Sequence, residues 1–319
     1  MNKSTRILLI AFVGLLAIYF LFFRGKDKVS TEKLDEKLFT ADSSKIEKIE
    51  IVKNTESLTL EKVNGNWMVT KPVNYPADTS AIYPMLSNLK RFTLESVAST
   101  NPAKFSAYLD SVNNTKVTVY QDGKQLGSFI VGKAAAGANS YIMKPDDQKI
   151  LIASNLVAGN FTKPAKDYRD KNIMQIPVFN IIKMEYKSTD SNKVDFAILK
   201  DSTGKWYLGK DTVSKAVMDS YMNIYSTLRT DDFKDTTITT FPVPTYMIKI
   251  TLAGSDQVVI NMYRDNNASS PGYIVQVSGK QQLFRFSDPV AAQLIKKAKD
   301  FVPDKPKTDT KPTDVKIKK

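Results

Sequence analysis

The stretch from Gly127 to Ala134 comes closest to a known chemical motif, because it fits the phosphate-binding pattern G-x-x-x-x-G-K. The pattern ends in Ala134, so the hydroxyl that would ligate Mg²⁺ is missing. Ser128 to Val131 have the composition of a strand, whereas a phosphate cradle needs a loop between a strand and a helix. The sequence therefore does not predict nucleotide binding at this position.

Carboxylates are the other side chains that could do chemistry here. Asp146-Asp147 and Asp231-Asp232 are adjacent pairs, but neighbours on a strand point to opposite faces and share no proton or metal ion. The oxygen-rich stretch 265–272 lacks the spacing of a calcium loop with a bidentate Glu at its end. We expect turns at these places. Two carboxylates far apart in the sequence could still converge, so a carboxylate-based hydrolase stays open as a remote alternative.

The composition removes most other catalytic chemistry. The chain has no histidine and no cysteine, so the usual thiolate nucleophiles, cysteine metal sites and neutral-pH acid–base groups are missing. We therefore predict a protein that is not an enzyme and has no catalytic residue, metal site or cofactor. Of the +13 formal charge, residues 1–28 hold +4 and residues 302–319 hold +3. The remaining charge is spread over the rest of the chain, as on an ordinary protein surface, so we predict no nucleic-acid partner.

Ile7 to Phe23 form a run of 17 residues without a charge, flanked by Arg6 and Arg24. As a helix this run would be about 25 Å long, close to the thickness of a hydrocarbon layer, and we predict a transmembrane segment with the lipid bilayer as its partner. Bulky aromatic residues follow where a signal peptidase needs small ones, so we expect an uncleaved anchor. The numbers of basic residues before and after the apolar run are nearly equal, so they do not decide the orientation of the segment in the membrane.

The region after the anchor has the alternation of short strands. Residues 45–71 predict a three-stranded meander, and a helical period then begins after Asp78 or Thr79 and runs to Phe92. Hairpins are expected around Asp122-Gly123 and Pro145-Asp146. A proline costs little in the first turn of a helix, so Pro84 favours a helix that begins at about Ser80.

The second half repeats this order of patterns. Trp206 takes the place of Trp67, Tyr273 takes the place of Tyr141, and a second helix carries Met218, Tyr221 and Tyr225. Preserved order with drifting loop lengths indicates duplication. Both tryptophans are expected in the cores of their modules.

These patterns predict an α+β fold: an N-terminal transmembrane helix followed by two tandem related modules, each an antiparallel sheet of a meander plus hairpins packed on one or two helices. The predicted parts are an anchor at 1–28, a linker at 29–44, a first repeat at 45–177, a second repeat at 178–302 and a disordered basic tail at 303–319.

The stretches "GNWMVTKPVNYPADTSAIYPMLSNLKRF", "VGKAAAGANSYIM" and "KDYRDKNI" resemble the bacterial domain of unknown function 4340 family. The shared pattern is a Trp, a Pro-Ala-Asp turn opening a helix, a later Gly plus Tyr hairpin and an Arg-Asp-Lys closure. The resemblance covers residues 45–177 well and the second repeat loosely, because residues 207–212 lack the Pro-Ala-Asp turn. It implies a membrane-anchored protein encoded beside ABC-type transport components of the gliding-motility kind, and it implies no catalytic residues.

The first hypothesis for function is a non-enzymatic, single-pass membrane protein of the cell envelope, with its folded region on the periplasmic side. It would be an accessory or scaffold component whose partners are membrane proteins of an ABC-type transport system. The alternative is a ligand-binding module with a cleft between the two repeats for a small molecule or glycan. The sequence identifies no ligand-binding residue for either.

Overall fold

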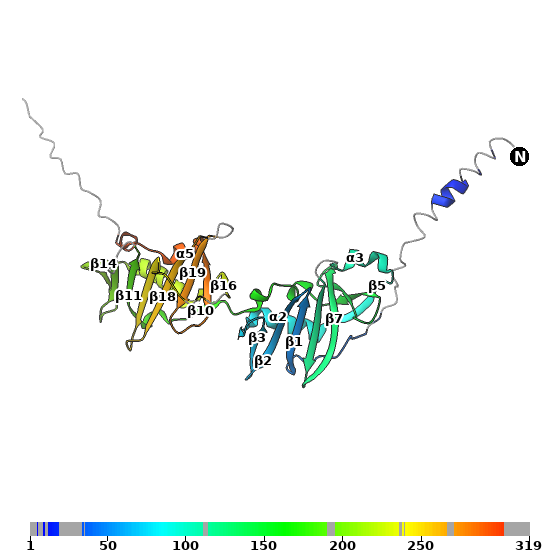
Figure 1. The fold of residues 1–319 in the computed structure, drawn as a ribbon, viewed down its shortest axis with the longest axis horizontal. Helices are drawn as coiled ribbons and strands as arrows, with labels where there is room; N and C mark the ends of the chain where they lie inside the picture. The colour runs from blue at the N-terminus through cyan, green and yellow to red at the C-terminus, as the bar shows by residue number, and fades with distance from the viewer. Residues whose placement is uncertain are drawn as a thin grey trace, which may run out of the picture. The chain divides into compact units, whose positions relative to one another are not determined.

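The protein, described by a computed structural model, divides after Asp170 into two compact units, which we call the first module and the second module (Figure 1). The structure describes Thr5, Leu9 and residues 12–18, 34, 36–110, 114–189, 195–235, 238, 240–266 and 271–302. The sequence analysis placed the boundary after residue 177. The chain divides earlier because residues 172–174 form a strand that pairs inside the second module.

The first module is built on a nine-stranded antiparallel sheet with the order β4-β3-β2-β1-β6-β7-β8-β9-β5. Its strands are β1 (Ile46–Lys53), β2 (Glu56–Val63), β3 (Asn66–Lys71), β4 (Tyr75–Pro76), β5 (Thr93–Ser99), β6 (Thr115–Gln121), β7 (Lys124–Ala134), β8 (Ser140–Met143) and β9 (Ile150–Ser154). Its helical segments are α2 (Thr79–Arg91), η1 (Pro102–Lys104), α3 (Phe105–Tyr108), η2 (Ala158–Asn160) and η3 (Ala165–Tyr168).

The second module has its own nine-stranded antiparallel sheet, with the order β14-β13-β12-β11-β17-β18-β19-β20-β16 (Figure 1). Its strands are β11 (Ile181–Ser188), β12 (Phe196–Lys200), β13 (Trp206–Leu208), β14 (Asp211–Val213), β16 (Asp232–Lys234), β17 (Tyr246–Leu252), β18 (Gln257–Asp265), β19 (Gly272–Val277) and β20 (Leu283–Ser287). A separate pair is formed by β10 (Asn172–Met174) and β15 (Leu228–Arg229). The helical segments are η4 (Val178–Asn180), α4 (Lys215–Ser226), α5 (Asp288–Leu294) and η5 (Ala298–Asp300).

The two sheets follow one plan down to the register of single residues. Strand for strand, the order in the second module repeats the order in the first. The pairing of β1 with β6 is irregular between Ile46 and Lys48, and the pairing of β11 with β17 is irregular at the equivalent place, between Ile181 and Lys183. Because a one-residue change of register would turn every side chain to the opposite face, equivalent positions can be compared residue by residue.

The paired tryptophans belong to this shared plan. Trp67 lies directly across from Lys62, and Trp206 lies directly across from Lys200. The ammonium groups are 5.5 Å and 5.7 Å from the indole rings, within the range of a cation–π contact. The indoles are only 7% and 8% exposed. Both tryptophans are therefore core residues, as predicted.

The leading segment of each module forms backbone hydrogen bonds with the stretch of chain that follows the long helix, α2 in the first module and α4 in the second. In the first module Leu94 N donates to Glu36 O at 2.8 Å, and in the second module Thr230 N donates to Lys171 O at 2.9 Å. Phe39 then packs edge-on against Phe92, with ring centroids 5.4 Å apart. Residue 34 and residues 36–44, which the sequence analysis placed in a linker, thus lie against the first module.

Helix α2 buries one face against the sheet of the first module. Its buried residues are Ala81, Ile82, Met85, Leu86, Asn88 and Leu89. They recur at three- and four-residue intervals, so they form one stripe against the sheet. The predicted N-cap is confirmed, since the Asp78 carboxylate accepts from Ser80 N at 2.9 Å. The helix begins at Thr79, one residue before the expected start at Ser80, and Pro84 lies in its second turn.

The predicted fold class, α+β led by a transmembrane helix, is wrong. The described residues are mostly antiparallel sheet, and among them only α2 and α4 exceed two turns. No helix in this described part is both long and apolar enough to cross a membrane. Of the predicted span, Leu9 and residues 12–18 are described and helical. The rest of Ile7 to Phe23, and the predicted tail at 303–319, lie outside the described residues.

The predicted equivalence of Tyr273 with Tyr141 is also wrong, by one residue. The buried–half-buried alternation of β9 and β20 is identical, and across them Ser140 pairs with Ala153 while Tyr273 pairs with Phe286. Tyr273 therefore corresponds to the buried Ser140. Tyr141 instead packs against Tyr108 on the other side of the strand, with centroids 4.9 Å apart. Sequence similarity cannot detect such a slip because a tyrosine fits either face.

We predict that Gly132→Ala destabilises the first module by roughly 1–3 kcal/mol, the usual cost of overpacking. A Cβ at residue 132 would lie 2.7 Å from Tyr108 O and 2.8 Å from Tyr141 O, and backbone atoms cannot move aside as a side chain can. Gly159→Ala is the control, since its Cβ would meet nothing within 4 Å. Thermal unfolding checks this, and equal melting temperatures for the two variants would contradict it.

Candidate functional site

The two modules differ at the end of the sheet where the first two strands of the meander are joined. In the first module Ile51 of β1 pairs with Leu58 of β2, and in the second module Tyr186 of β11 pairs with Phe196 of β12. Ile51 and Tyr186 are both the sixth residue of their strands. An aliphatic pair in one module thus stands where the other module has an aromatic pair.

The second module fills this end of its sheet with rings. Tyr186 and Phe196 are stacked with centroids 4.3 Å apart. Phe301, in the closing segment, lies 5.7 Å from Phe196 and 5.2 Å from Tyr221 of α4. Such offset and edge-on contacts add to the free energy gained by burial of the rings. The end of this module is therefore closed by its own side chains.

Three tyrosine hydroxyls are enclosed by the same rings. Tyr186 OH donates to Tyr221 OH, Tyr221 OH donates to Leu294 O at 2.9 Å, and the hydroxyls of Tyr221 and Tyr225 are 2.5 Å apart. Because each phenol has a partner, burial is tolerated. Burial also raises the pKa of all three phenols above the usual value near 10.

The first module leaves a cavity of about 850 Å³ at this end, which we call the lysine groove. Ile51, Leu58 and Phe161 form its buried apolar floor. Four lysines stand around that floor: Lys53, Lys71, Lys163 and Lys166. The cavity lining includes one carboxylate, Glu56. A cavity of this size with an apolar floor and a few charged groups has the character of a binding site.

Strand geometry explains where the lysines lie. Successive residues of a strand alternate between faces, so Lys53 follows Ile51 on the inner face of β1. Lys71 lies at the end of β3, beyond the place where the pairing of β3 with β2 becomes irregular. Each lysine is the last residue of its strand. On β1 the inner face thus changes from apolar to basic at the end of the strand.

The closing segment supplies the other half of the groove. Phe161, Lys163 and Lys166 lie between η2 and the end of η3. The equivalent segment of the second module runs from Leu294 to Phe301. Both segments contain Ala-Lys-Asp followed by an aromatic residue, Tyr168 in one and Phe301 in the other. This short repeat was available in the sequence and the sequence analysis overlooked it.

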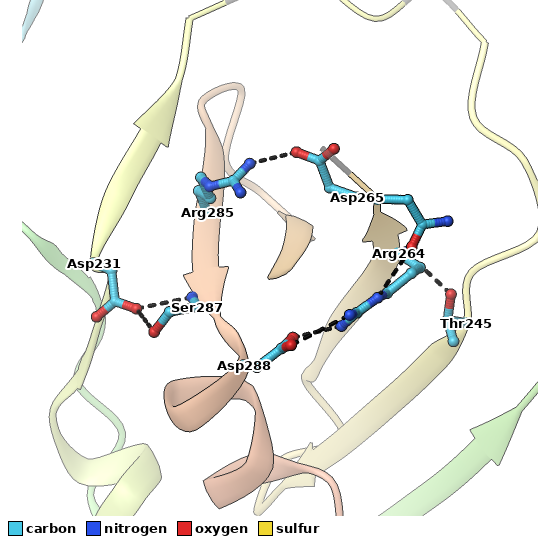
Figure 2. A network of polar contacts seen from close by, with 8 residues as sticks. Asp231, Thr245, Arg264, Asp265, Arg285, Ser287 and Asp288 are labelled. Carbon is cyan, nitrogen blue, oxygen red and sulfur yellow. Dashed lines mark hydrogen bonds and ion pairs between the residues drawn. The ribbon is translucent and has the colours of Figure 1, made fainter. Parts of the chain in front are cut away.

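Asp231 and Asp265, which the sequence analysis considered, belong to a polar network of the second module. Figure 2 shows Asp231 accepting from Ser287, Asp265 paired with Arg285, and Asp288 paired with Arg264. Arg264 also donates its backbone N–H to Thr245 Oγ1 at 3.1 Å (Figure 2). Each carboxylate in this network has a polar partner of its own. The network ties β18 to β20 and to the start of α5.

Part of this network is shared by both modules and part is specific to the second. In the first module Ser154 Oγ donates to Glu95 Oε2 at 2.7 Å, at the positions equivalent to Ser287 and Asp231. The two Arg–Asp pairs occur at positions where the first module has no ion pair among its described residues. No group of three acidic side chains that could hold a metal ion occurs in the described part of the chain.

The other motifs singled out in the sequence are accounted for by the strands. Gly127 to Ala134 lie within β7, so the expected strand is confirmed at the phosphate-loop pattern. Asp146-Asp147 fall between β8 and β9, in the expected turn. The stretch 265–272 lies partly outside the described residues.

The profile of the domain of unknown function 4340 family matches residues 67–245, more than half of the chain. The chain belongs to the domain of unknown function 4340 family. No curated protein matches the chain, and no solved structure matches it either. The family description assigns no activity, so the chemistry has to be argued from the residues.

In this member of the 4340 family, the Pro-Ala-Asp and Tyr-Arg-Asp motifs meet in space. Asp78 N donates to Tyr168 O at 2.8 Å, and Asp170 N donates to Pro76 O at 2.8 Å. Arg169 is 1% exposed, and its guanidinium lies 4.8 Å from the ring of Tyr75. The motifs thus fasten the closing segment to the turn before α2. The segment that carries Lys163 and Lys166 is thereby held next to that turn.

We predict that the second module loses stability as the pH rises above 10. The folded pKa of the three buried phenols is raised, so between pH 10 and that higher pKa the unfolded chain has released protons that the folded chain still holds. This contribution is fully present below pH 10. It falls by at most about 1.4 kcal/mol per pH unit for each phenol.

Tyr225→Phe removes one phenol and should therefore lose less stability between pH 10 and pH 12 than the wild-type chain. Denaturant unfolding checks this in a Trp67→Phe background, where Trp206 reports on the second module alone. Tyr83→Phe serves as the control, since Tyr83 is 61% exposed on α2 of the first module. The same pH dependence in the Tyr225→Phe variant and the wild type would contradict the assignment.

Proposed function

We propose that this protein is a non-enzymatic accessory protein that holds an acidic segment of a partner protein in the lysine groove of its first module. The observation that carries the proposal is the presence of four lysines and one glutamate around an apolar floor. An occupant that complements this site has carboxylates for the lysines and apolar side chains for Ile51, Leu58 and Phe161.

The comparison of the two modules supports a binding role for the groove. Both modules share strand order and register, yet the second closes the same end with stacked rings. Lys53 is Ser188 in the second module, so a lysine appears where the cavity is open. A cavity costs packing energy that a tyrosine would supply. Among the described residues, rings occupy in the second module the place where the first module has this cavity, and the difference favours an occupant.

The hydrolase alternative has little support from the described cavities. The four described cavities include one carboxylate each: Asp300, Glu56, Asp219 and Asp110. Acid–base hydrolysis of a glycoside needs two carboxylates on either side of the bond. Binding is therefore the function that these cavities support best.

A small anionic molecule with an apolar body is the second candidate occupant. The volume of about 850 Å³ lies within the range of small-molecule sites, and the lining is more basic than acidic. This differs from the cleft between repeats that the sequence analysis considered, because the groove belongs to one module. The cell-envelope location and the ABC-type transport partners that the resemblance implies stay predictions.

The proposal predicts that Lys53→Ser, Lys71→Gln and Lys163→Gln, combined in one variant, weaken binding of an acidic peptide at least tenfold. The probe is a synthetic peptide of alternating glutamate and leucine, and isothermal titration at several salt concentrations measures its Kd. Three lost charge contacts of about 0.5 kcal/mol or more each account for a change of this size. Salt should weaken binding to the wild-type chain more than binding to the variant.

Lys124→Gln with Lys149→Gln is the matched control, because both residues are exposed lysines of the same module outside the groove. If the control variant loses as much affinity for the peptide as the triple variant, the net charge of the protein and not the groove determines binding, and the proposal is contradicted. Dodecyl phosphate tests the second candidate. Saturable binding of dodecyl phosphate, with no binding of the peptide, would replace the protein partner by a small amphiphile. Recovery of ABC-type transporter subunits by the wild-type chain but not by the triple variant would support the predicted partner.

A further inference from the structure

The second module has an exposed aromatic side chain beside a cavity of its own. Phe179, in η4, is 75% exposed. It lines a cavity of about 730 Å³ together with Val178, Trp206 and Met222, and η4 lies against α4. We call this cavity the Phe179 groove. Phe179 thus presents an apolar surface to solvent beside a cavity that is lined by both apolar and polar side chains.

The first module shows what the same position looks like without this feature. Lys62 Nζ donates to Ser44 O at 2.9 Å, and Lys200 Nζ donates to Phe179 O at 3.2 Å. The two lysines are equivalent because each lies across from its module's tryptophan. Phe179 therefore occupies the position of Ser44, and Val178 occupies the position of Ser43. The backbone contact is unchanged, while two small polar side chains have been replaced by large apolar ones.

The charges around the Phe179 groove select for an acidic occupant. Three lysines line the cavity, Lys200, Lys205 and Lys215, against one carboxylate, Asp219. That carboxylate is already paired with Lys215. The groove therefore offers net positive charge beside an apolar wall. A peptide that places an aromatic or aliphatic side chain between carboxylates complements both properties.

We propose that the Phe179 groove is a second docking site, specific to the second module, for a partner segment with an apolar anchor residue flanked by carboxylates. Phe179 packs against the anchor, and Lys205 faces its acidic neighbours. The site is separate from the lysine groove, which belongs to the first module and lacks an exposed aromatic side chain in its lining. The inference therefore stands even if the lysine groove has another occupant.

Trp206 provides a direct readout, because the chain has two tryptophans and Trp206 lines this cavity. In a Trp67→Phe background, the full chain is titrated with a synthetic nonapeptide that has a central phenylalanine flanked by glutamates. We expect a saturable change in Trp206 emission. Phe179→Ser, which installs the residue that the first module has at this position, should raise the Kd about tenfold or more.

Val243→Ser is the matched control, since Val243 is also in the second module, is 72% exposed and does not line the groove. A Kd that is unchanged by Phe179→Ser, or raised equally by Val243→Ser, would overturn the proposal. Absence of saturable peptide binding at millimolar concentration would overturn it as well. If vesicles of anionic phospholipid alter Trp206 emission and the peptide does not, the surface faces a lipid layer and the peptide proposal is wrong.

The two grooves are distinguished by repeating the titration in the triple lysine variant of the first module. The Phe179 proposal predicts the same Kd for the nonapeptide in that variant and in the parent chain. A Kd raised at least tenfold by the lysine substitutions, with no effect of Phe179→Ser, would assign the peptide to the lysine groove and reject the second site.

Discussion

The limited reach of one helix governs the architecture of both modules. A helix of 13 residues such as α2 is about 20 Å long, while nine strands spaced about 4.8 Å apart form a sheet nearly 40 Å wide. The helix therefore covers only part of the inner face. Leading segments, short 3₁₀ turns and the closing segment must cover the remainder. Whether a cavity exists depends on how well these pieces fill the end of the sheet.

Duplication makes each module a reference for the other. Shared features, such as the Lys–Trp pairs and the acid–serine bond at β5 or β16, maintain the fold in both modules. Features found in only one of the modules are not needed to maintain the shared fold. The lysine groove in the first, and the tyrosine cluster and Phe179 groove in the second, show that the modules have diverged around a constant frame. This divergence is where binding is to be sought.

The periodicity of apolar residues was enough to predict the meander, the hairpin at Asp122-Gly123 and the buried stripe of α2, because these elements depend on residues that are close in sequence. The predicted fold class and spanning helix were wrong. Tyr273 was matched to the wrong strand position because the register of a strand depends on its pairing with other strands. The lysine groove could not be predicted for the same reason. Lys53, Lys71 and Lys163 lie on three separate segments, and only the folded module brings them around one apolar floor.

The strand pairing of Glu36 with Leu94 also sets a limit on how the first module can be shortened. A fragment that starts at Lys45 would remove the backbone partners of Leu94 and Glu95 on β5, the edge strand of the sheet. Such an edge is a template for another chain. The segment ahead of β1 therefore shields the start of β5 from pairing with another chain, and β10 likewise pairs with β15.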